Sequence, residues 1–309
     1  MKVLILIAVL LIPSVSAYAQ KESLPIIDMH VHCYDNESYF TAPDMYGTQS
    51  PENADTHLKQ TYEMMKKYNI VKAVIFGSVN AVENWVSKDT DKRFIRGLMV
   101  YSPQELDTIQ FENMIKEGKL EVFGEIGAVY AGYDLSDPEF EPYLKICERY
   151  DIPVAIHTGG GPPEISYIER FKNYRITLGD PFLIEDVLIK HPKLRIYLMH
   201  AGEVFYEHAV RLMFAYPQLY TDIAVLLWVH PLTKSYVVDF LKRAKEANVL
   251  DRVMFGSDQM VWPHAIEKSI EYLNSLNFLT EEDKKDIFYN NAIKFLKLNE
   301  KDITGDQKH

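Results

Sequence analysis

Two histidines, His30 and His32, stand two residues apart in an apolar stretch near the start of the chain. Side chains alternate between the two faces of a β-strand, so both imidazoles point the same way if this stretch is a strand. Imidazole and carboxylate groups that meet in one place are typical ligands of divalent metals such as Zn2+. Four more such groups end other apolar stretches: Glu125 in Phe-Gly-Glu-Ile-Gly, His157 in Val-Ala-Ile-His-Thr-Gly, His200 in Tyr-Leu-Met-His-Ala-Gly and Asp258 in Met-Phe-Gly-Ser-Asp.

The stretches that carry these groups alternate with longer amphipathic segments, a pattern typical of a parallel sheet covered by helices. Strands are predicted at residues 26–32, 71–77, 94–101, 122–127, 153–157, 194–200, 219–223 and 253–258. Helices are predicted at residues 55–68, 80–87, 105–117, 139–150, 182–190, 204–215, 233–247 and 263–276. Eight such units predict an α/β protein, a single-domain (β/α)8 TIM barrel over residues 20–300. An extra C-terminal helix at 281–298 is expected to pack outside the barrel.

An open, doubly wound sheet is the alternative architecture. It favours a Gly-rich turn after the first strand, where this chain has His32, Cys33 and Tyr34. In the barrel, all six candidate ligands fall at the carboxyl ends of strands, where TIM barrels carry their sites. Burying such groups without partners is costly, and a divalent metal partners several of them at once. Asp28 is expected to face inward below the ligands, where it either bonds a histidine or stabilises the strand.

The residues Asp28-Met29-His30-Val31-His32, with His157, His200 and Gly256-Ser257-Asp258, resemble the amidohydrolase superfamily. The phrases around the last three sites are most similar to the amidohydrolase-2 branch, which includes aminocarboxymuconate-semialdehyde decarboxylase. The resemblance covers the whole chain after the N-terminal segment. It implies that a divalent ion, expected to be Zn2+, is bound by His30, His32, His157 and Asp258, with His200 nearby.

Glu125 complicates this ligand set. Its Gly-Glu-Ile-Gly setting is similar to the strand-four ligand of TatD-type nucleases, in which such a glutamate bridges two metals. That likeness implies an alternative in which His157 and His200 hold a second ion. One ion is preferred over two, because the amidohydrolase-2 branch is mostly mononuclear.

The resemblance implies a metal-dependent hydrolase that directs a metal-activated water at a small amide, ester or lactone. Asp258 is expected to take the proton of the water and pass it to the leaving group, while His200 polarises or orients the scissile bond. Nonoxidative decarboxylation of an aromatic or unsaturated acid is the first alternative, with Arg170 or Arg175 binding the carboxylate. A TatD-like phosphoester hydrolase is the second, and a metal-scavenging protein without turnover is the non-enzymatic one.

Loops predicted at the same end of the barrel offer substrate contacts. Candidates are Tyr130 after the fourth strand, Gly160 after the fifth, and Gln259 and Trp262 after the eighth. The run of three glycines around Gly160 predicts backbone amides that approach a ligand closely. Cys33 is expected to point away from the site and not to pair with Cys147.

The N-terminus predicts export. Residues 1–19 combine a cationic start, an apolar run and Ala17-Tyr18-Ala19, which is typical of a signal peptide cleaved before Gln20. We therefore expect a periplasmic or secreted protein with no membrane segment after cleavage, and residues 301–309 as a flexible tail. The net charge of -11 and the lack of a basic run disfavour nucleic-acid partners. A small-molecule substrate is expected, and a homo-oligomer is compatible with the sequence.

Overall fold

The computed structural model describes residues 24–304 of the chain. Eight strands pair in sequence order, each parallel to its neighbours. They are β1 (Ile26–His32), β2 (Ile70–Phe76), β3 (Phe94–Val100), β4 (Val122–Ile126), β5 (Val154–His157), β6 (Ile196–Met199), β7 (Leu219–Asp222) and β8 (Val253–Met254). Two backbone hydrogen bonds join the first strand to the last segment: Met29 N–H donates to Phe255 O at 2.9 Å, and Asp258 N–H to His30 O at 2.8 Å. The predicted (β/α)8 barrel is confirmed.

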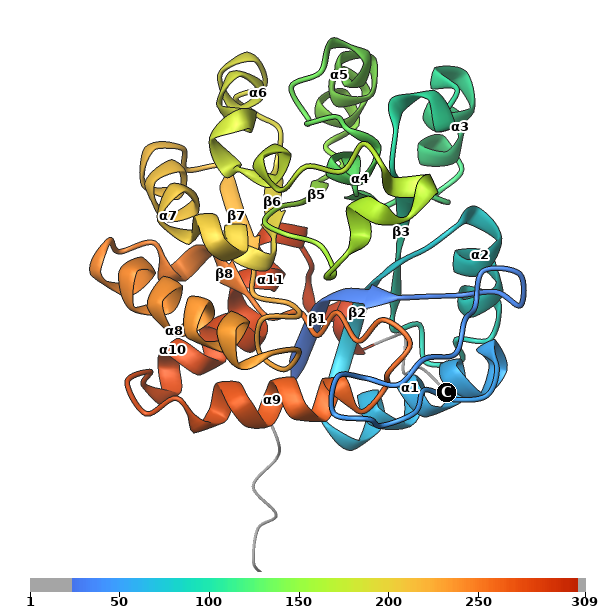
Figure 1. Cartoon of the computed structure of the whole chain (residues 1–309), viewed down its shortest axis with the longest axis vertical. Coiled ribbons are helices and arrows are strands. Elements are labelled where there is room, and N and C mark those ends of the chain that lie inside the picture. Colours follow the sequence, from blue (N-terminus) through green and yellow to red (C-terminus); the bar gives the residue numbers. More distant parts are fainter. Residues whose placement is uncertain (1–23, 305–309) are drawn as a thin grey trace, which may run out of the picture.

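Helices surround the ring of strands (Figure 1). The α-helices are α1 (Ala54–Lys67), α2 (Val79–Ser87), α3 (Thr108–Lys116), α4 (Ala128–Ala131), α5 (Glu141–Tyr150), α6 (Glu185–Lys190), α7 (Tyr206–Ala215), α8 (Pro231–Glu246), α9 (Ala265–Ser275), α10 (Glu281–Lys285), α11 (Asn291–Leu296) and α12 (Glu300–Thr304). Short 3-10 turns are η1 (Pro103–Glu105), η2 (Pro138–Phe140), η3 (Ile165–Tyr167), η4 (Glu169–Phe171), η5 (Ile176–Gly179), η6 (Pro181–Ile184), η7 (His200–Phe205) and η8 (Leu250–Arg252), and η9 (Asp286–Asn290) is a π turn. Within residues 24–304, none of the helices combines the length and the apolar character that crossing a membrane requires.

The predictions for the two ends of the chain fall largely outside the described residues. The predicted signal peptide at residues 1–19 lies outside the described residues. At the other end, α12 continues regular structure to Thr304, inside the stretch predicted as a tail, and the rest of that tail is also outside them.

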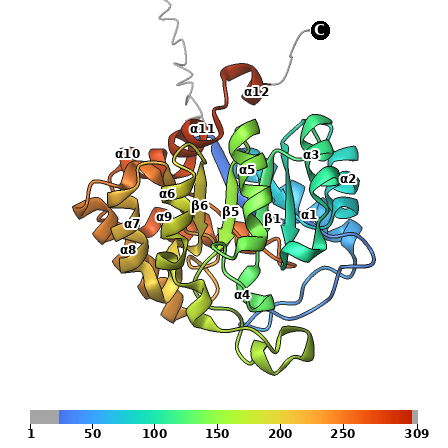
Figure 2. The same cartoon turned by 90° about the horizontal axis from the view of Figure 1, so that it is seen from above.

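The predicted last helix does not pack beside the barrel. It is divided into α10, η9 and α11, and α11 closes the end of the barrel opposite to α4 (Figure 2). Phe295 of α11 packs in the inner apolar cluster with Ile27, Met29 and Tyr197. The expectation that this segment packs outside the barrel was wrong, because apolar side chains of α11 fill the end of the barrel at which the strands begin.

The side chains of the first strand depart from the regular alternation between its two faces. The register of β1 against β2 shifts between Asp28 and Val31, and Met29 joins the inner cluster. Asp28 therefore does not continue the row of ligands. Its Oδ1 accepts hydrogen bonds from the backbone N–H groups of His30 (3.1 Å) and Ser257 (2.9 Å), so it ties β1 to the segment after β8.

The loop after β1 is fastened to α9 by a buried carboxylate. Asp44 Oδ2 accepts a hydrogen bond from Lys268 Nζ at 2.8 Å and lies 3.0 Å from His264 Nε2. Burial opposes ionisation, but Lys268 and His264 hold the pKa of the Asp44 carboxyl well below its usual range. Trp262 Nε1–H donates to Ala42 O at 2.9 Å and adds a second tie.

Asp44→Asn is expected to lower the free energy of unfolding by about 2 kcal/mol near neutral pH, allowing for solvent screening of Lys268. For a chain of this size that is a fall in Tm of about 5 °C. Because the folded-state pKa of Asp44 is depressed, its stabilisation is present above the unfolded value of about 4 and is lost as the pH falls below it. In thermal melts at several pH values, the Tm of wild type should therefore approach that of Asp44→Asn as the pH becomes acidic. Asp239→Asn, at an exposed carboxylate, is the control; an equal effect of both changes would contradict the assignment.

Candidate metal centre

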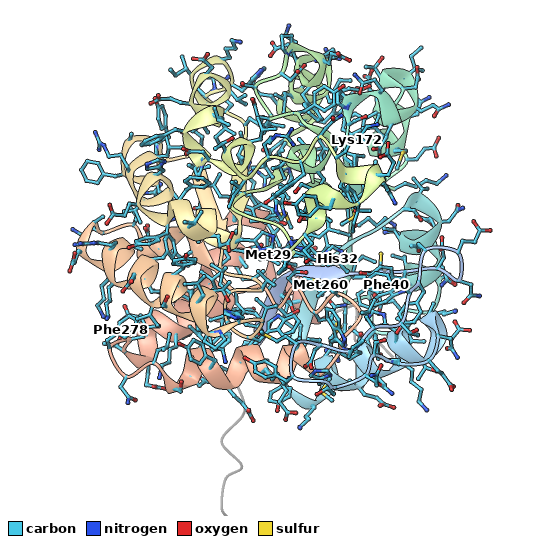
Figure 3. All side chains as sticks on the ribbon, in the orientation of Figure 1. Met29, His32, Phe40, Lys172, Met260 and Phe278 are labelled. Carbon is cyan, nitrogen blue, oxygen red and sulfur yellow. The ribbon has the colours of Figure 1, made fainter. Side chains whose placement is uncertain are left out.

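Glu125 lies at the centre of the predicted ligands. Its Oε2 is 3.4 Å from His30 Nε2 and 3.4 Å from His32 Nε2. Asp258 Oδ1 completes this group, 3.0 Å from His32 Nε2 and 3.8 Å from His30 Nε2. All four residues are less than 10% exposed. Figure 3 shows His32 near the middle of the ring of helices.

The other oxygen of Glu125 faces a second group. Glu125 Oε1 is 2.8 Å from His157 Nδ1 and 3.8 Å from His200 Nε2, and these two nitrogens are 3.2 Å apart. The structure thus brings all six predicted residues together. Their ligand atoms fall into three overlapping groups: Glu125 with His157 and His200, His30 with His32 and Asp258, and His30 with His200 and Asp222.

Asp222 is a member of the site that the sequence reasoning missed. It ends β7, and its Oδ2 lies 3.3 Å from His30 Nδ1. Its Oδ1 accepts hydrogen bonds from the backbone N–H groups of His200 (2.8 Å) and Ala224 (3.1 Å). The signal was present in the sequence, because Asp222 is a carboxylate at the end of a predicted strand. Asp222 orients the His30 ring through Nδ1, and its hydrogen bonds to backbone N–H groups stabilise the turn that carries His200.

The backbone at two ligands is left-handed. His200 has a φ of 65° and Asp258 a φ of 44°, a region that residues other than glycine seldom adopt. His200 follows directly on the end of β6, and Asp258 lies four residues after the end of β8. β8 ends at Met254 and is therefore shorter than the prediction, which extended it to residue 258.

The electrostatics of the cluster favour positive charge at its centre. Burial opposes the ionisation of Glu125, yet the imidazoles of His157 and His200 hold the pKa of its carboxyl well below the usual range. Burial likewise opposes charge on Asp258, but His30 and His32 lower its pKa to about 2. The pKa of His30 is raised well above its usual value, because the nearby carboxylates outweigh burial. Ionised carboxylates and imidazoles in this arrangement suit a divalent cation.

A family model described as Amidohydrolase matches residues 27–298. The chain belongs to the amidohydrolase family. The match spans the barrel and confirms the resemblance to the amidohydrolase-2 branch. A comparison with curated protein sequences gave no significant match.

Solved structures of the same fold include enzymes of two kinds. A "probable 2-pyrone-4,6-dicarboxylic acid hydrolase" from Acinetobacter baumannii is 14% identical, with a TM-score of 0.62 over 88% of this chain and 99% of that chain. A 5-carboxyvanillate decarboxylase from Novosphingobium aromaticivorans, solved with manganese, is 17% identical, with a TM-score of 0.59 over 90% and 97%. A TIM-barrel protein from Bordetella bronchiseptica is 19% identical, with a TM-score of 0.64 over 89% and 99%. At these identities the likeness shows the fold of the amidohydrolase.

Two residues predicted to contact the substrate, Gln259 and Gly160, form hydrogen bonds within the protein. Gln259 is fully buried, and its side-chain amide pairs with the backbone of His32: Oε1 accepts from His32 N–H at 2.9 Å, and Nε2 donates to His32 O at 2.8 Å. The N–H of Gly160 donates to Glu203 Oε2. The N–H of Gly161 donates to Tyr174 Oη at 2.6 Å, and that of Gly159 to Gly179 O at 2.8 Å. In the structure, therefore, Gln259 and these glycine N–H groups are hydrogen-bonded within the protein, and their role toward a substrate stays a prediction.

Tyr130 does lie beside the cluster. Its hydroxyl is 3.4 Å from His157 Nε2, and its ring is 4.9 Å from the His157 ring. Tyr101, which the sequence reasoning missed, packs edge-on against Tyr130 at 5.9 Å. Burial raises the pKa of Tyr101 to about 12, so its hydroxyl stays protonated. Together these rings form an aromatic wall next to His157, whereas Trp262 joins the loops after β1 and β8.

A second aromatic wall covers His32. The ring of Tyr34 stacks near that of His32 at 6.2 Å and contacts His57 at 5.5 Å. Burial lowers the pKa of His57 to about 3, so this ring is neutral. Cys33 is buried on the outer side of β1, and both Cys33 and Cys147 are unpaired.

Proposed function

We propose that the amidohydrolase is a metal-dependent hydrolase of small, neutral amides, esters or lactones. The observation that carries this proposal is the state of the buried ligand atoms. Within the described residues, His30 Nε2 and Asp258 Oδ1 are buried, lie 3.8 Å apart and make no hydrogen bond. A folded protein seldom leaves such atoms unsatisfied, and a divalent ion supplies what they lack. His30, His32, Asp258 and Oε2 of Glu125 would hold it.

The ion supplies Lewis acidity, which brings the pKa of a coordinated water towards about 7. Asp258 is suited to move the proton of that water. Its Oδ1 faces the imidazoles of His30 and His32, while Oδ2 is 4.0 Å from His200 Nδ1. Oδ2 can therefore accept a proton and return it to the leaving group. Asp222 holds the ring of His30, and Gln259 holds the backbone of His32.

The charges around the cluster favour a neutral substrate. Within the described part of the chain, the ion pairs of the six ligands involve other members of the cluster and Asp222, and no lysine or arginine. Arg175 donates to the carbonyl oxygens of Lys172 and Tyr174 in its own loop. A substrate carboxylate would thus meet the carboxylates of the cluster, and no lysine or arginine of residues 24–304 pairs with the six ligands.

Decarboxylation is the second candidate, and one contact favours it. The guanidinium of Arg170 lies 5.2 Å from the centre of the Tyr101 ring, next to the aromatic wall of Tyr101 and Tyr130. From there Arg170 could bind the carboxylate of a flat acid. One of the similar structures is a decarboxylase.

A substrate panel separates the two reactions. The metal-loaded protein is assayed against neutral lactones, esters and amides and against aromatic carboxylic acids, with acid release, uptake of oxygen from labelled water and release of carbon dioxide as readouts. We expect acid release with label in the product. Arg170→Ala should then leave kcat/KM unchanged within about twofold, whereas a decarboxylase that uses Arg170 should lose at least tenfold. Carbon dioxide release without label would contradict the hydrolase.

We further propose that Zn2+ is the resident ion and that the protein is exported. Imidazoles with carboxylates suit Zn2+, although a similar structure contains manganese. The metal content of protein purified from its native source tests the first point. Mass spectrometry of the same protein tests the second, since an exported chain should begin at Gln20; an intact Met1 start would contradict export.

A further inference from the structure

The outer faces of α6 and α7 carry exposed apolar side chains. Ile189 of α6 is 61% exposed, and Phe214 of α7 is 63% exposed. Of the α-helices within residues 24–304, only these two expose a large apolar side chain beyond the first turn. The two helices are neighbours in the outer ring (Figure 1). A single exposed apolar residue is ordinary, but apolar residues that gather on one face mark an interaction site.

These side chains lie along one groove of about 290 Å3. The groove is lined by residues of η6, α6 and α7, namely Phe182, Glu185, Arg211, Leu212 and Ala215. Phe214 adjoins the groove, since the Arg211 guanidinium lies 5.4 Å from the centre of the Phe214 ring. Ile189 follows Glu185 by four residues and therefore lies on the same side of α6. We call the surface formed by five of these residues the α6–α7 face: Phe182, Glu185, Ile189, Arg211 and Phe214.

One wall of the groove is already held in place. The ring of Phe182, which is 41% exposed, stacks on the His208 ring with 4.1 Å between the ring centres and 11° between the planes. His208 Nδ1 in turn lies 2.8 Å from Oδ1 of Asp180, the N-cap residue of η6. A side chain that is fixed in advance loses little conformational entropy when a partner covers it.

The α6–α7 face also carries charges of both signs that are not paired with each other. Arg211 forms no ion pair with any described residue. Glu185, which lines the same groove, accepts a hydrogen bond from the Tyr216 hydroxyl at 2.8 Å but has no cationic partner among residues 24–304. A face that offers an unpaired cation and an unpaired anion can complement a second copy of itself. In a twofold interface each such pair occurs twice, because a contact of one residue with another is repeated in the opposite direction.

We propose that the amidohydrolase forms a twofold-symmetric homodimer through the α6–α7 face. Phe214 of each copy fills the groove of the other copy, and Arg211 of each copy pairs with Glu185 of the other. A stable dimer buries about 800 Å2 on each partner, so the interface extends beyond the groove. It takes in Leu183 of η6 and Val204 of η7, which are 37% and 41% exposed.

Other occupants fit the α6–α7 face less well. A small molecule is disfavoured, because the volume of the groove is at the lower limit for ligand pockets, about 300 Å3. An anionic lipid surface would meet the carboxylates of Glu185 and Asp186. The face lies on the outside of the ring of helices, whereas the candidate metal ligands lie at strand ends within the ring (Figure 1). The dimer is therefore independent of the proposed metal-dependent function, and either can fail without the other.

Sedimentation equilibrium of the full chain tests the dimer. We expect a dimer with a Kd below about 1 µM. Phe214→Glu places a carboxylate in the interface and should weaken association by at least about 100-fold. Ile109→Glu, at a residue of α3 that is 69% exposed, is the matched control and should change the Kd by less than about threefold. A wild-type monomer at about 100 µM, or equal weakening by both changes, would overturn the proposal.

Charge reversal tests the pairing across the twofold axis. Arg211→Glu and Glu185→Arg should each weaken the homodimer by at least about tenfold, because each change places like charges opposite one another. In an equimolar mixture of the two variants, the heterodimer regains both oppositely charged pairs and should associate within about threefold of wild type. A mixture that stays monomeric, although circular dichroism shows that both variants are folded, would overturn the twofold arrangement. Homodimers that neither change weakens would contradict it as well.

Discussion

Asp258→Asn is expected to lower kcat by about three orders of magnitude while the protein keeps its metal. The asparagine carbonyl can still face His30 and His32 as Oδ1 does, but the amide cannot take up a proton. KM should change little, because no predicted substrate contact is removed. Steady-state kinetics on the best substrate of the panel, with metal content measured on the same samples, checks this result.

The control for this change is Asp251→Asn, at a carboxylate that is 59% exposed on η8. It removes the same charge from the protein without touching the cluster, and it should leave kcat within about twofold of wild type. If Asp258→Asn retains both metal and more than a tenth of the wild-type kcat, another group moves the proton.

Removing the metal is expected to abolish turnover and to destabilise the fold together. Without a cation the buried carboxylates and imidazoles lose their shared partner. An ion present at about 1,000 times its Kd stabilises the folded state by about 4 kcal/mol. Its removal should therefore lower Tm by about 10 °C for a chain of this size. Both losses should reverse when Zn2+ or Mn2+ is restored.

Differential scanning fluorimetry and activity, measured on the same chelated and reloaded samples, check the pair of effects. Mg2+ is the control ion, because it prefers oxygen ligands and suits four imidazoles poorly. Full activity in protein with less than a tenth of an equivalent of any divalent ion would refute the metal-dependent mechanism.

The positions of the six ligands could be predicted because they follow from a repeated local rule. Each ends a short apolar stretch, and strand ends of one barrel meet at one rim. The same rule applied to the seventh stretch would have found Asp222, which follows Thr221 at the end of β7. The sequence therefore contained the information needed to predict Asp222.

Which ring nitrogen of His157 and of His200 faces Glu125 could not be predicted. It depends on which carbonyl oxygen lies behind each ring: Gly160 behind His157, and Ala224 behind His200. Gln259 is a similar case, since its partner His32 is 227 residues away along the chain. Such pairings are set by tertiary contacts, and no local pattern in the sequence encodes them.

The hydrogen bonds between β1 and the segment after β8 can form only after the last part of the barrel has been synthesised. A nascent chain carries His30 and His32 from the outset, but it lacks both Asp258 and the backbone that closes the ring until the last units leave the ribosome. Contacts across so long a span form late, because loop closure must precede them. We therefore expect the proposed ion to bind tightly only after the last βα unit has folded, because Asp258 is one of its ligands.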